Sequence, residues 1–125
     1  LGLINSDNKN GAYEKYSDIS RKLKITAMEC DKPIIALHQL NRAGADRKDK
    51  RPKLSDIRDS GKIEQDADSV LFVFRPYYYE RNPKNKDMFQ ILIPKNRHGK
   101  TGTANLLYNE STQEIKDRIE VNNAF

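Results

Sequence analysis

The sequence predicts an α/β fold in which a mostly parallel sheet carries helices on its faces. Apolar residues at 1–4, a helical stripe, and a second apolar run at 34–37 give the order strand, helix, strand. Such an alternation connects parallel strands through a right-handed crossover. The continuous apolar run at 70–74 is typical of a strand buried on both faces. A chain of 125 residues is long enough for one domain with a core.

The first half of the chain follows this order. Polar residues and glycine at 5–11 form a turn after the first strand. A helix is expected over 13–31, because apolar residues recur there at steps of three and four. Pro33 stops that helix, and the β-branched run at 34–37 is the next expected strand. The apolar stripe of the helix consists of Tyr16, Ile19, Leu23, Ala27 and Cys30.

The second half alternates polar loops with shorter elements. After a polar loop we expect one or two helical turns near 55–58 and 62–67, and then a strand at 69–75. Residues 76–87 are expected to be a loop and 88–93 a strand. The loop at 94–102 leads to a strand at 103–108, and a final strand is expected at 114–120. Segments 34–37 and 69–75 matter most, because ligands of such sheets collect at the carboxyl ends of strands.

Composition restricts the cellular location of the protein more than it restricts its function. The net charge of +5 favours a polyanionic partner weakly, since acidic residues are interspersed with the basic ones. A single cysteine, Cys30, excludes a disulfide within the chain, and two histidines make a zinc site improbable, so no metal site is expected. The chain shows neither an apolar run long enough to span a membrane nor a secretion signal, and we expect a cytoplasmic protein with no membrane partner.

Two basic segments follow strand ends. Residues 41–62 hold eight Lys and Arg against four Asp, which suits either contact with a phosphate backbone or a solvated surface loop. The segment KNRHGKTG places Lys95, Arg97, His98 and Lys100 close together. Lys95 and Arg97 are expected to point the same way, because strand side chains alternate between faces. That pair can hold a multiply charged anion, although the segment lacks the spacing of a phosphate loop. Gln39, after the strand at 34–37, can contact a phosphate or a water.

Three of these segments together resemble the C-terminal RecA-like motor domain of DnaB-type replicative DNA helicases. They are IIALHQLNR at 34–42, DKRPKLSDIRDSGKIEQDADSVLFVFR at 49–75 and IPKNRHGKTGTANLLY at 93–108. The resemblance implies that residues 1–125 are the distal half of one RecA-like domain, with a C-terminal strand and tail from about 109. Nothing in the sequence matches the family's glycine-rich phosphate loop, catalytic glutamate or metal-binding aspartate.

The resemblance also implies roles for particular residues. Gln39 corresponds to the sensor of the γ-phosphate, and Arg97, with Lys95 beside it, to the arginine finger that reaches a neighbouring subunit's nucleotide. Arg58, Asp59 and Gly61 correspond to the central DNA-binding loop. The implied parent protein is a hexameric ring that uses ATP and Mg²⁺, binds single-stranded DNA and works with primase and a helicase loader. The 125 residues alone are expected to be inactive and to hold no cofactor tightly.

Some positions depart from the family's pattern. His38 stands where serine is usual, Asp59 where glutamate is usual, and His98 where asparagine is common. Two alternatives stay open at this point. A RecA-like DNA-repair ATPase shares a similar KNR-G segment, and a non-enzymatic single-strand DNA-binding or ring-modulating protein would keep the DNA loop without the motor. In the latter, the tyrosines at 77–79 could stack on bases, although a partly buried cluster at a strand end is favoured. We expect Asp66 and Asp68 to be caps or ion-pair partners.

Overall fold

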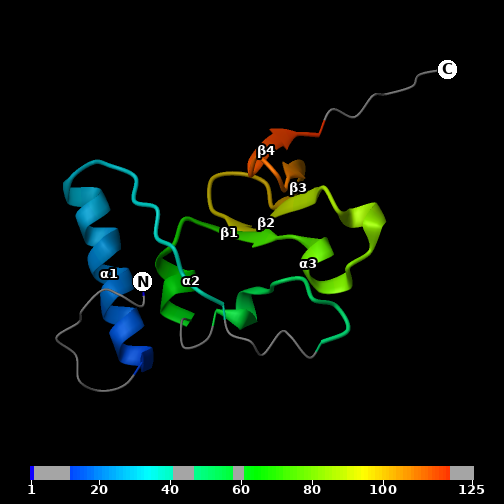
Figure 1. Ribbon diagram of the computed structural model, residues 1–125. Helices are drawn as coiled ribbons and strands as arrows, with labels where there is room; N and C mark the ends of the chain where they lie inside the picture. The colour runs from blue at the N-terminus through cyan, green and yellow to red at the C-terminus, as the bar shows by residue number, and fades with distance from the viewer. Residues whose placement is uncertain (2–11, 41–46, 58–60, 119–125) are drawn as a thin grey trace.

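Figure 1 shows the computed structural model, which describes residues 1, 12–40, 47–57 and 61–118, with the side chains of residues 12 and 13 left out. Helix α1 (Ala12–Glu29) stands at one side of the molecule, next to the short helix α2 (Gly61–Asp66). A four-stranded sheet occupies the centre, and α3 (Pro76–Glu80) lies at its other side.

Helix α1 forms where the apolar stripe predicted it. Ile19 is buried, and Leu23 and Ala27 on the same stripe are half-buried, whereas Arg21 and Lys22 are exposed. The stripe ends before Cys30, which is exposed. The helix therefore packs by the ordinary rule that one apolar face turns inward.

The sheet has the order β1-β2-β3-β4, with strands β1 (Ser69–Phe74), β2 (Met88–Asn96), β3 (Gly102–Asn109) and β4 (Glu114–Asp117). All three ladders are antiparallel, with pairs such as Val73↔Ile91 and Ile91↔Ala104. The expectation of a mostly parallel sheet is therefore wrong for the described strands. The reason is local: β2, β3 and β4 follow one another through short turns, and a short turn can join only antiparallel neighbours.

Residues 34–37 are not a strand in the described chain. A strand requires a hydrogen-bonded neighbour, and the contact that this segment shows among described residues is a hydrogen bond of 2.5 Å from the Leu1 amino group to the Leu37 carbonyl oxygen. Ile35 is 90% exposed and Leu37 82%. The segment is apolar, as expected, but it does not pair with any strand among the described residues. The strand expected at 1–4 falls mostly outside the described residues.

The core lies on one face of the sheet. Phe72, Phe74 and Leu92 are buried there, and Leu54 and Ile57 pack against them from the connecting loop. On the opposite face of β1, Leu71 and Val73 are more than half exposed. The expectation that residues 70–74 form a strand is confirmed, whereas the expectation of burial on both faces is wrong in this structure.

The expected helical turns are present as the 3₁₀ turn η2 (Leu54–Asp56) and as α2. The segment at 76–87, expected to be a loop, contains α3 and a further 3₁₀ turn, η3 (Pro83–Asn85). Proline at the first position fits a helix start, because its missing N–H is not needed there. Arg81 ends α3 in the left-handed conformation, with a φ of 51°.

Candidate functional site

Lys95 and Arg97 converge on the carboxyl end of α2. The Lys95 ammonium donates to the carbonyl oxygen of Glu64, and Arg97 Nη2 donates to that of Gln65 at 3.0 Å. Arg97 Nη1 is 2.6 Å from Oδ1 of Asp68. The prediction that these two cations point the same way is confirmed. Cations at a helix carboxyl end are favourable, since the last carbonyl oxygens there carry partial negative charge.

Helix α2 places Gly61 at its start, directly after residues 58–60. An added Cβ at Gly61 would meet no atom within 4 Å, and its φ lies outside the left-handed region. Neither space nor backbone conformation therefore demands glycine at this position. Arg58 and Asp59, the other residues assigned to the DNA loop, lie outside the described residues.

Gln39 is exposed and follows the apolar segment at 34–37. Among the described residues, Lys95 and Arg97 bind Glu64, Gln65 and Asp68, and no hydrogen bond joins either of them to Gln39. The neighbouring His38 packs edge-on against Tyr16, with ring centroids 5.2 Å apart. Burial lowers the pKa of His38, so packing favours the neutral form of the ring.

The basic segment after residue 46 is partly used for internal structure. Arg47 forms a two-point contact with Asp56, with Nη1–Oδ1 at 2.9 Å and Nη2–Oδ2 at 2.6 Å. The Arg47 guanidinium holds the pKa of the buried Asp56 carboxyl below its usual range. Arg51 donates to Gln90 Oε1 at 3.0 Å and lies over the Phe74 ring. Arg47 is thus held within its own segment and Arg51 against β2, while contact of this basic segment with a phosphate backbone stays a prediction.

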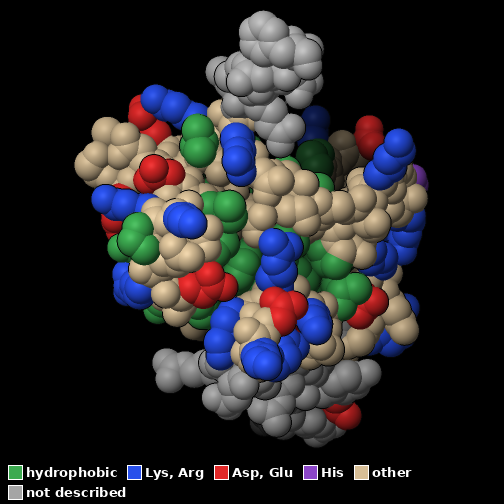
Figure 2. Space-filling model, turned by 90° about the vertical axis from the view of Figure 1, so that its right-hand side faces the viewer, with side chains coloured by type: hydrophobic (Ala, Val, Ile, Leu, Met, Phe, Trp, Pro, Cys, Tyr) green, Lys and Arg blue, Asp and Glu red, His purple; other side chains and the backbone are tan. Residues whose placement is uncertain are grey.

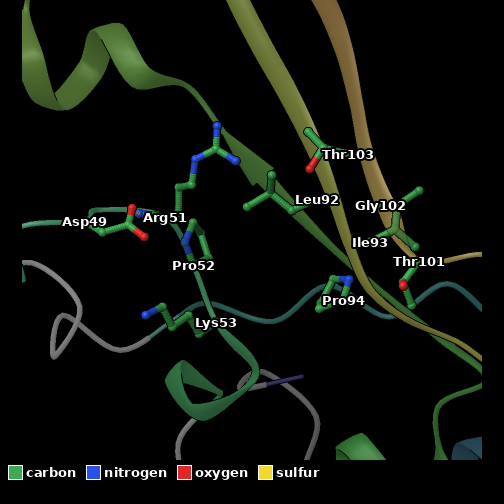
Figure 3. Close-up of a pocket in the computed structure, with 10 residues that line it drawn as sticks. All are labelled: Asp49, Arg51, Pro52, Lys53, Leu92, Ile93, Pro94, Thr101, Gly102 and Thr103. Carbon is green, nitrogen blue, oxygen red and sulfur yellow. Dashed lines mark hydrogen bonds between the residues drawn. The ribbon is translucent and has the colours of Figure 1, made fainter.

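An open depression of about 380 Å³ lies between this segment and the strands β2 and β3 (Figure 3). The loop contributes Asp49, Arg51 and Lys53 to one side, and Thr101 and Thr103 come from the other. None of the site residues predicted from the sequence lines it. The depression and the Lys95–Arg97 cluster are therefore separate features.

The tyrosines after β1 form a surface cluster with arginines. Tyr78 is 65% exposed and Tyr79 47%, while Arg75 lies 4.4 Å over the Tyr108 ring. Arg81 lies over the Tyr77 and Tyr78 rings. The expectation of a partly buried cluster is confirmed for Tyr77, which is half-buried, and for Tyr79, which stacks on the buried Phe74 ring with centroids 5.6 Å apart, whereas Tyr78 is mostly exposed. On the face seen in Figure 2, Lys and Arg side chains are interspersed with Asp and Glu.

Two contacts that support the site escaped the sequence reasoning. Lys24 of α1 is 2.5 Å from Asp68 Oδ2, and Ser20 of α1 donates to Asp66 Oδ2 at 2.9 Å. The expectation of an ion-pair partner is confirmed for Asp68, whereas the partner of Asp66 is a serine hydroxyl. No local signal identifies Lys24 or Ser20, since each lies more than 40 positions from its partner.

Neither a metal site nor a membrane-spanning helix is found among the described residues. They contain no group of three or more His, Cys, Asp or Glu side chains arranged to hold a metal ion. No helix in the same part of the chain has the length and hydropathy needed to cross a bilayer.

Comparison with known proteins places these features in a family. Residues 1–117 match the DnaB-like helicase C-terminal domain. The chain is 48% identical over 100 residues to the replicative DNA helicase DnaC of Bacillus subtilis, covering 80% of this chain and 22% of that protein. It is 44% identical over 113 residues to a probable plasmid replicative DNA helicase of Chlamydia psittaci, covering 90% of this chain and 24% of that protein. The chain thus spans about a quarter or less of the length of these relatives.

Solved structures agree with this result. An ATPase domain superposes with a TM-score of 0.89 at 39% identity, covering 94% of this chain and 42% of that one. A DnaB-like replicative helicase, described together with its interactions with primase, superposes with a TM-score of 0.88 at 38% identity, covering 93% of this chain and 29% of that one. The predicted fold class, a partial α/β domain of the RecA-like kind, is confirmed by these neighbours, although the described strands are antiparallel.

Proposed function

Because this chain belongs to the DnaB-like helicase C-terminal domain family, we propose that it is the distal part of an ATP-driven replicative DNA helicase motor. In this proposal residues 1–125 are part of one RecA-like domain, and residues from about 109 form its last strand and tail. The sequence contains no glycine-rich phosphate loop, so ATP and Mg²⁺ are held mainly by residues outside these 125. The isolated chain is expected to be inactive.

The arrangement of Arg97 supports its role as a finger acting on a neighbouring subunit. Its side chain is 44% exposed although two of its nitrogens are held by Asp68 and Gln65. A guanidinium carries five N–H donors, so a further face remains for an anion. Bound MgATP supplies the phosphoryl group that is transferred, and a cation directed at its oxygens stabilises the charge that develops. Lys95 adds a second positive charge beside Arg97.

The same proposal gives Gln39 the role of γ-phosphate sensor within its own subunit. Its exposed position after the segment at 34–37 leaves the side-chain amide available to a nucleotide. In this proposal Gln39 and the Lys95–Arg97 pair serve two different nucleotide sites, one in the subunit and one in its neighbour. Such sites exist only in an oligomer, and we propose a hexameric ring.

Gly61 supports the DNA-binding role of the segment at its amino-terminal side. Since neither crowding nor φ explains a glycine there, close approach of a phosphate to the backbone is the functional reason that remains. We assign Arg58, Asp59 and Gly61 to contact with single-stranded DNA. Primase and a helicase loader are the proposed protein partners of the assembled ring in the cytoplasm.

The test of the finger uses the full-length protein with Arg97→Ala and, as a matched control, Lys100→Ala. Both positions are exposed and lie in or next to the turn between β2 and β3. We expect Arg97→Ala to lower DNA-stimulated ATP turnover by roughly 10³-fold with nucleotide binding retained, because a finger acts on the transition state. Lys100→Ala should stay within about twofold of the wild type. Turnover by Arg97→Ala close to the wild-type rate would contradict the proposal.

The DNA contact is tested separately with Gly61→Ala, using Gly102→Ala as the control. An added Cβ meets nothing within 4 Å at either position, so neither change should disturb folding. Gly61→Ala should weaken binding of a fluorescent single-stranded oligonucleotide, since a methyl group would stand between backbone and phosphate. Equal affinities for the two variants would remove Gly61 from the DNA contact.

A further inference from the structure

Asp68 joins three parts of the molecule at one carboxylate. Its Oδ2 accepts from Lys24 of α1 at 2.5 Å, and its Oδ1 accepts from Arg97 at 2.6 Å. The residue itself lies two positions after α2 and one before β1. Each carboxylate oxygen therefore has a different cation, contributed by a different element.

Arg97 is fixed at both ends by this region. Its backbone N–H donates to the Asp68 carbonyl oxygen at 2.8 Å, and its Nη2 donates to the Gln65 carbonyl oxygen at 3.0 Å. The Asp68 carboxylate holds Nη1. A long side chain that is held at its root and at two terminal nitrogens loses much of its rotamer freedom before any ligand arrives.

The carboxylate stays charged in this setting. The hydrogen bond from Lys24 is the main cause that lowers the pKa of Asp68, and the charges of Lys24, Arg97 and His98 act in the same direction, against partial burial. Asp68 is thus an anion at neutral pH and a charge-assisted acceptor for Arg97.

The same contacts connect Arg97 to α2. Lys95 donates to the carbonyl oxygen of Glu64, so the last turn of this six-residue helix is held from β2 by two cations. The other end of α2 begins at Gly61. A shift of α2 along its axis would therefore move the groups that hold Lys95 and Arg97.

We propose that Asp68 is a positioning residue that orients Arg97 for phosphoryl transfer in the neighbouring subunit and ties its orientation to α2. The proposal rests on the finger role of Arg97 given above. Asp68 acts through Arg97. It binds Nη1 of the guanidinium, and the N–H donors that Asp68 and Gln65 do not use remain available to phosphate oxygens. Loss of this carboxylate should therefore lower kcat more than it lowers the free energy of unfolding, because ion pairs between half-exposed side chains stabilise proteins little.

The experiment compares Asp68→Asn with Asp66→Asn in the full-length protein. Both remove one negative charge at the carboxyl end of α2, but Asp66 binds Ser20 and not Arg97. We expect Asp68→Asn to lower kcat for DNA-stimulated ATP hydrolysis on the order of tenfold with an unchanged KM, since misplacing a catalytic group costs rate. Asp66→Asn should keep kcat within about twofold. Thermal unfolding and ring assembly should be similar in both variants.

Further variants separate the possible outcomes. Asp68→Glu should recover part of kcat, because it restores the charge at a shifted position, and Lys24→Met should keep kcat within about twofold, because it leaves the Asp68–Arg97 contact. Unchanged kcat in Asp68→Asn would overturn the proposal. A rise in turnover without DNA would also overturn it, since Asp68 would then hold Arg97 back. If Asp68→Asn fails to fold, Asp68→Glu decides: a kcat below the wild-type value with an unchanged KM supports the positioning role, and a wild-type kcat or a changed KM contradicts it.

Arg97→Ala separates this inference from the proposed function. If Arg97→Ala loses turnover and Asp68→Asn does not, only the positioning role fails. If Arg97→Ala keeps turnover, the finger role fails, and Asp68 has no catalytic group to position.

Discussion

Replacing Asp56 by alanine is expected to loosen the internal fold of the segment at 47–57. Asp56 is 6% exposed, and its carboxylate accepts two hydrogen bonds from Arg47 and a third, at 2.8 Å, from the backbone N–H of Lys53. The substitution leaves these donors without their acceptor. One side chain therefore joins the start, the middle and the end of this segment.

The expected magnitude follows from the exposure of the two partners. Removing one member of a fully buried ion pair costs about 3–5 kcal/mol, whereas one unsatisfied polar group costs about 1–3 kcal/mol. The Asp56 side chain is 7% exposed but that of Arg47 is 30% exposed, so the freed guanidinium can turn to water. We expect the free energy of local opening to fall by about 2–3 kcal/mol, which is roughly a 30- to 150-fold faster exchange.

Hydrogen exchange followed by mass spectrometry on the full-length protein measures this effect in the peptide that covers 47–57. The matched control is Asp49→Ala, because that exposed carboxylate accepts a hydrogen bond from the backbone N–H of Arg51 at 3.0 Å. In Asp49→Ala the exchange rate of this peptide should change by only about twofold, because surface substitutions usually have small effects on stability. An exchange rate in Asp56→Ala within about threefold of the wild-type rate would refute the reasoning that this ion pair holds the segment together.

Three further predictions follow from the described contacts. Gln90→Ala should destabilise the protein by about 1–2 kcal/mol in denaturant unfolding, because this buried amide bridges two polar side chains; an unchanged midpoint would contradict it. Since the pKa of Asp56 is lowered in the folded state, its contribution to stability is present above about pH 4 and is lost as pH falls further; Asp56→Asn should flatten the acid limb of a thermal-unfolding series. Gly99→Ala would bring Cβ to 2.6 Å from Asn96 Nδ2, the movable end of a side chain, so the melting temperature should fall by only a few degrees; a drop above about 10 °C would show that Asn96 cannot yield.

Several features of the structure could be predicted from local sequence pattern. The stripe through Ile19 and Leu23 predicted α1, because the period of side-chain direction is a property of the backbone alone, and the strand-forming residues at 103–108 predicted β3. The convergence of Lys95 and Arg97 was also predictable, since side chains two positions apart along an extended chain point to the same side. The segments quoted for the resemblance predicted the family that the comparisons confirm.

Other features required the folded molecule. The antiparallel pairing of β1 with β2 depends on which strand comes to lie beside which, and the exposed state of Leu37 depends on whether a neighbour is present. Helix α3 was missed because three tyrosines in a row carry no amphipathic period. These outcomes are decided by contacts between elements and have no signature within one segment.

The sequence by itself determined α1, the strands β1 to β3 and the family, because these follow from side-chain pattern and from motif order along the chain. Only the tertiary structure decided that Asp68 forms ion pairs with both Lys24 and Arg97, and that Arg47 forms an ion pair with Asp56. The physical reason is range: periodicity acts between neighbours in the chain, whereas charge pairs form wherever folding brings cation and carboxylate within a few ångströms.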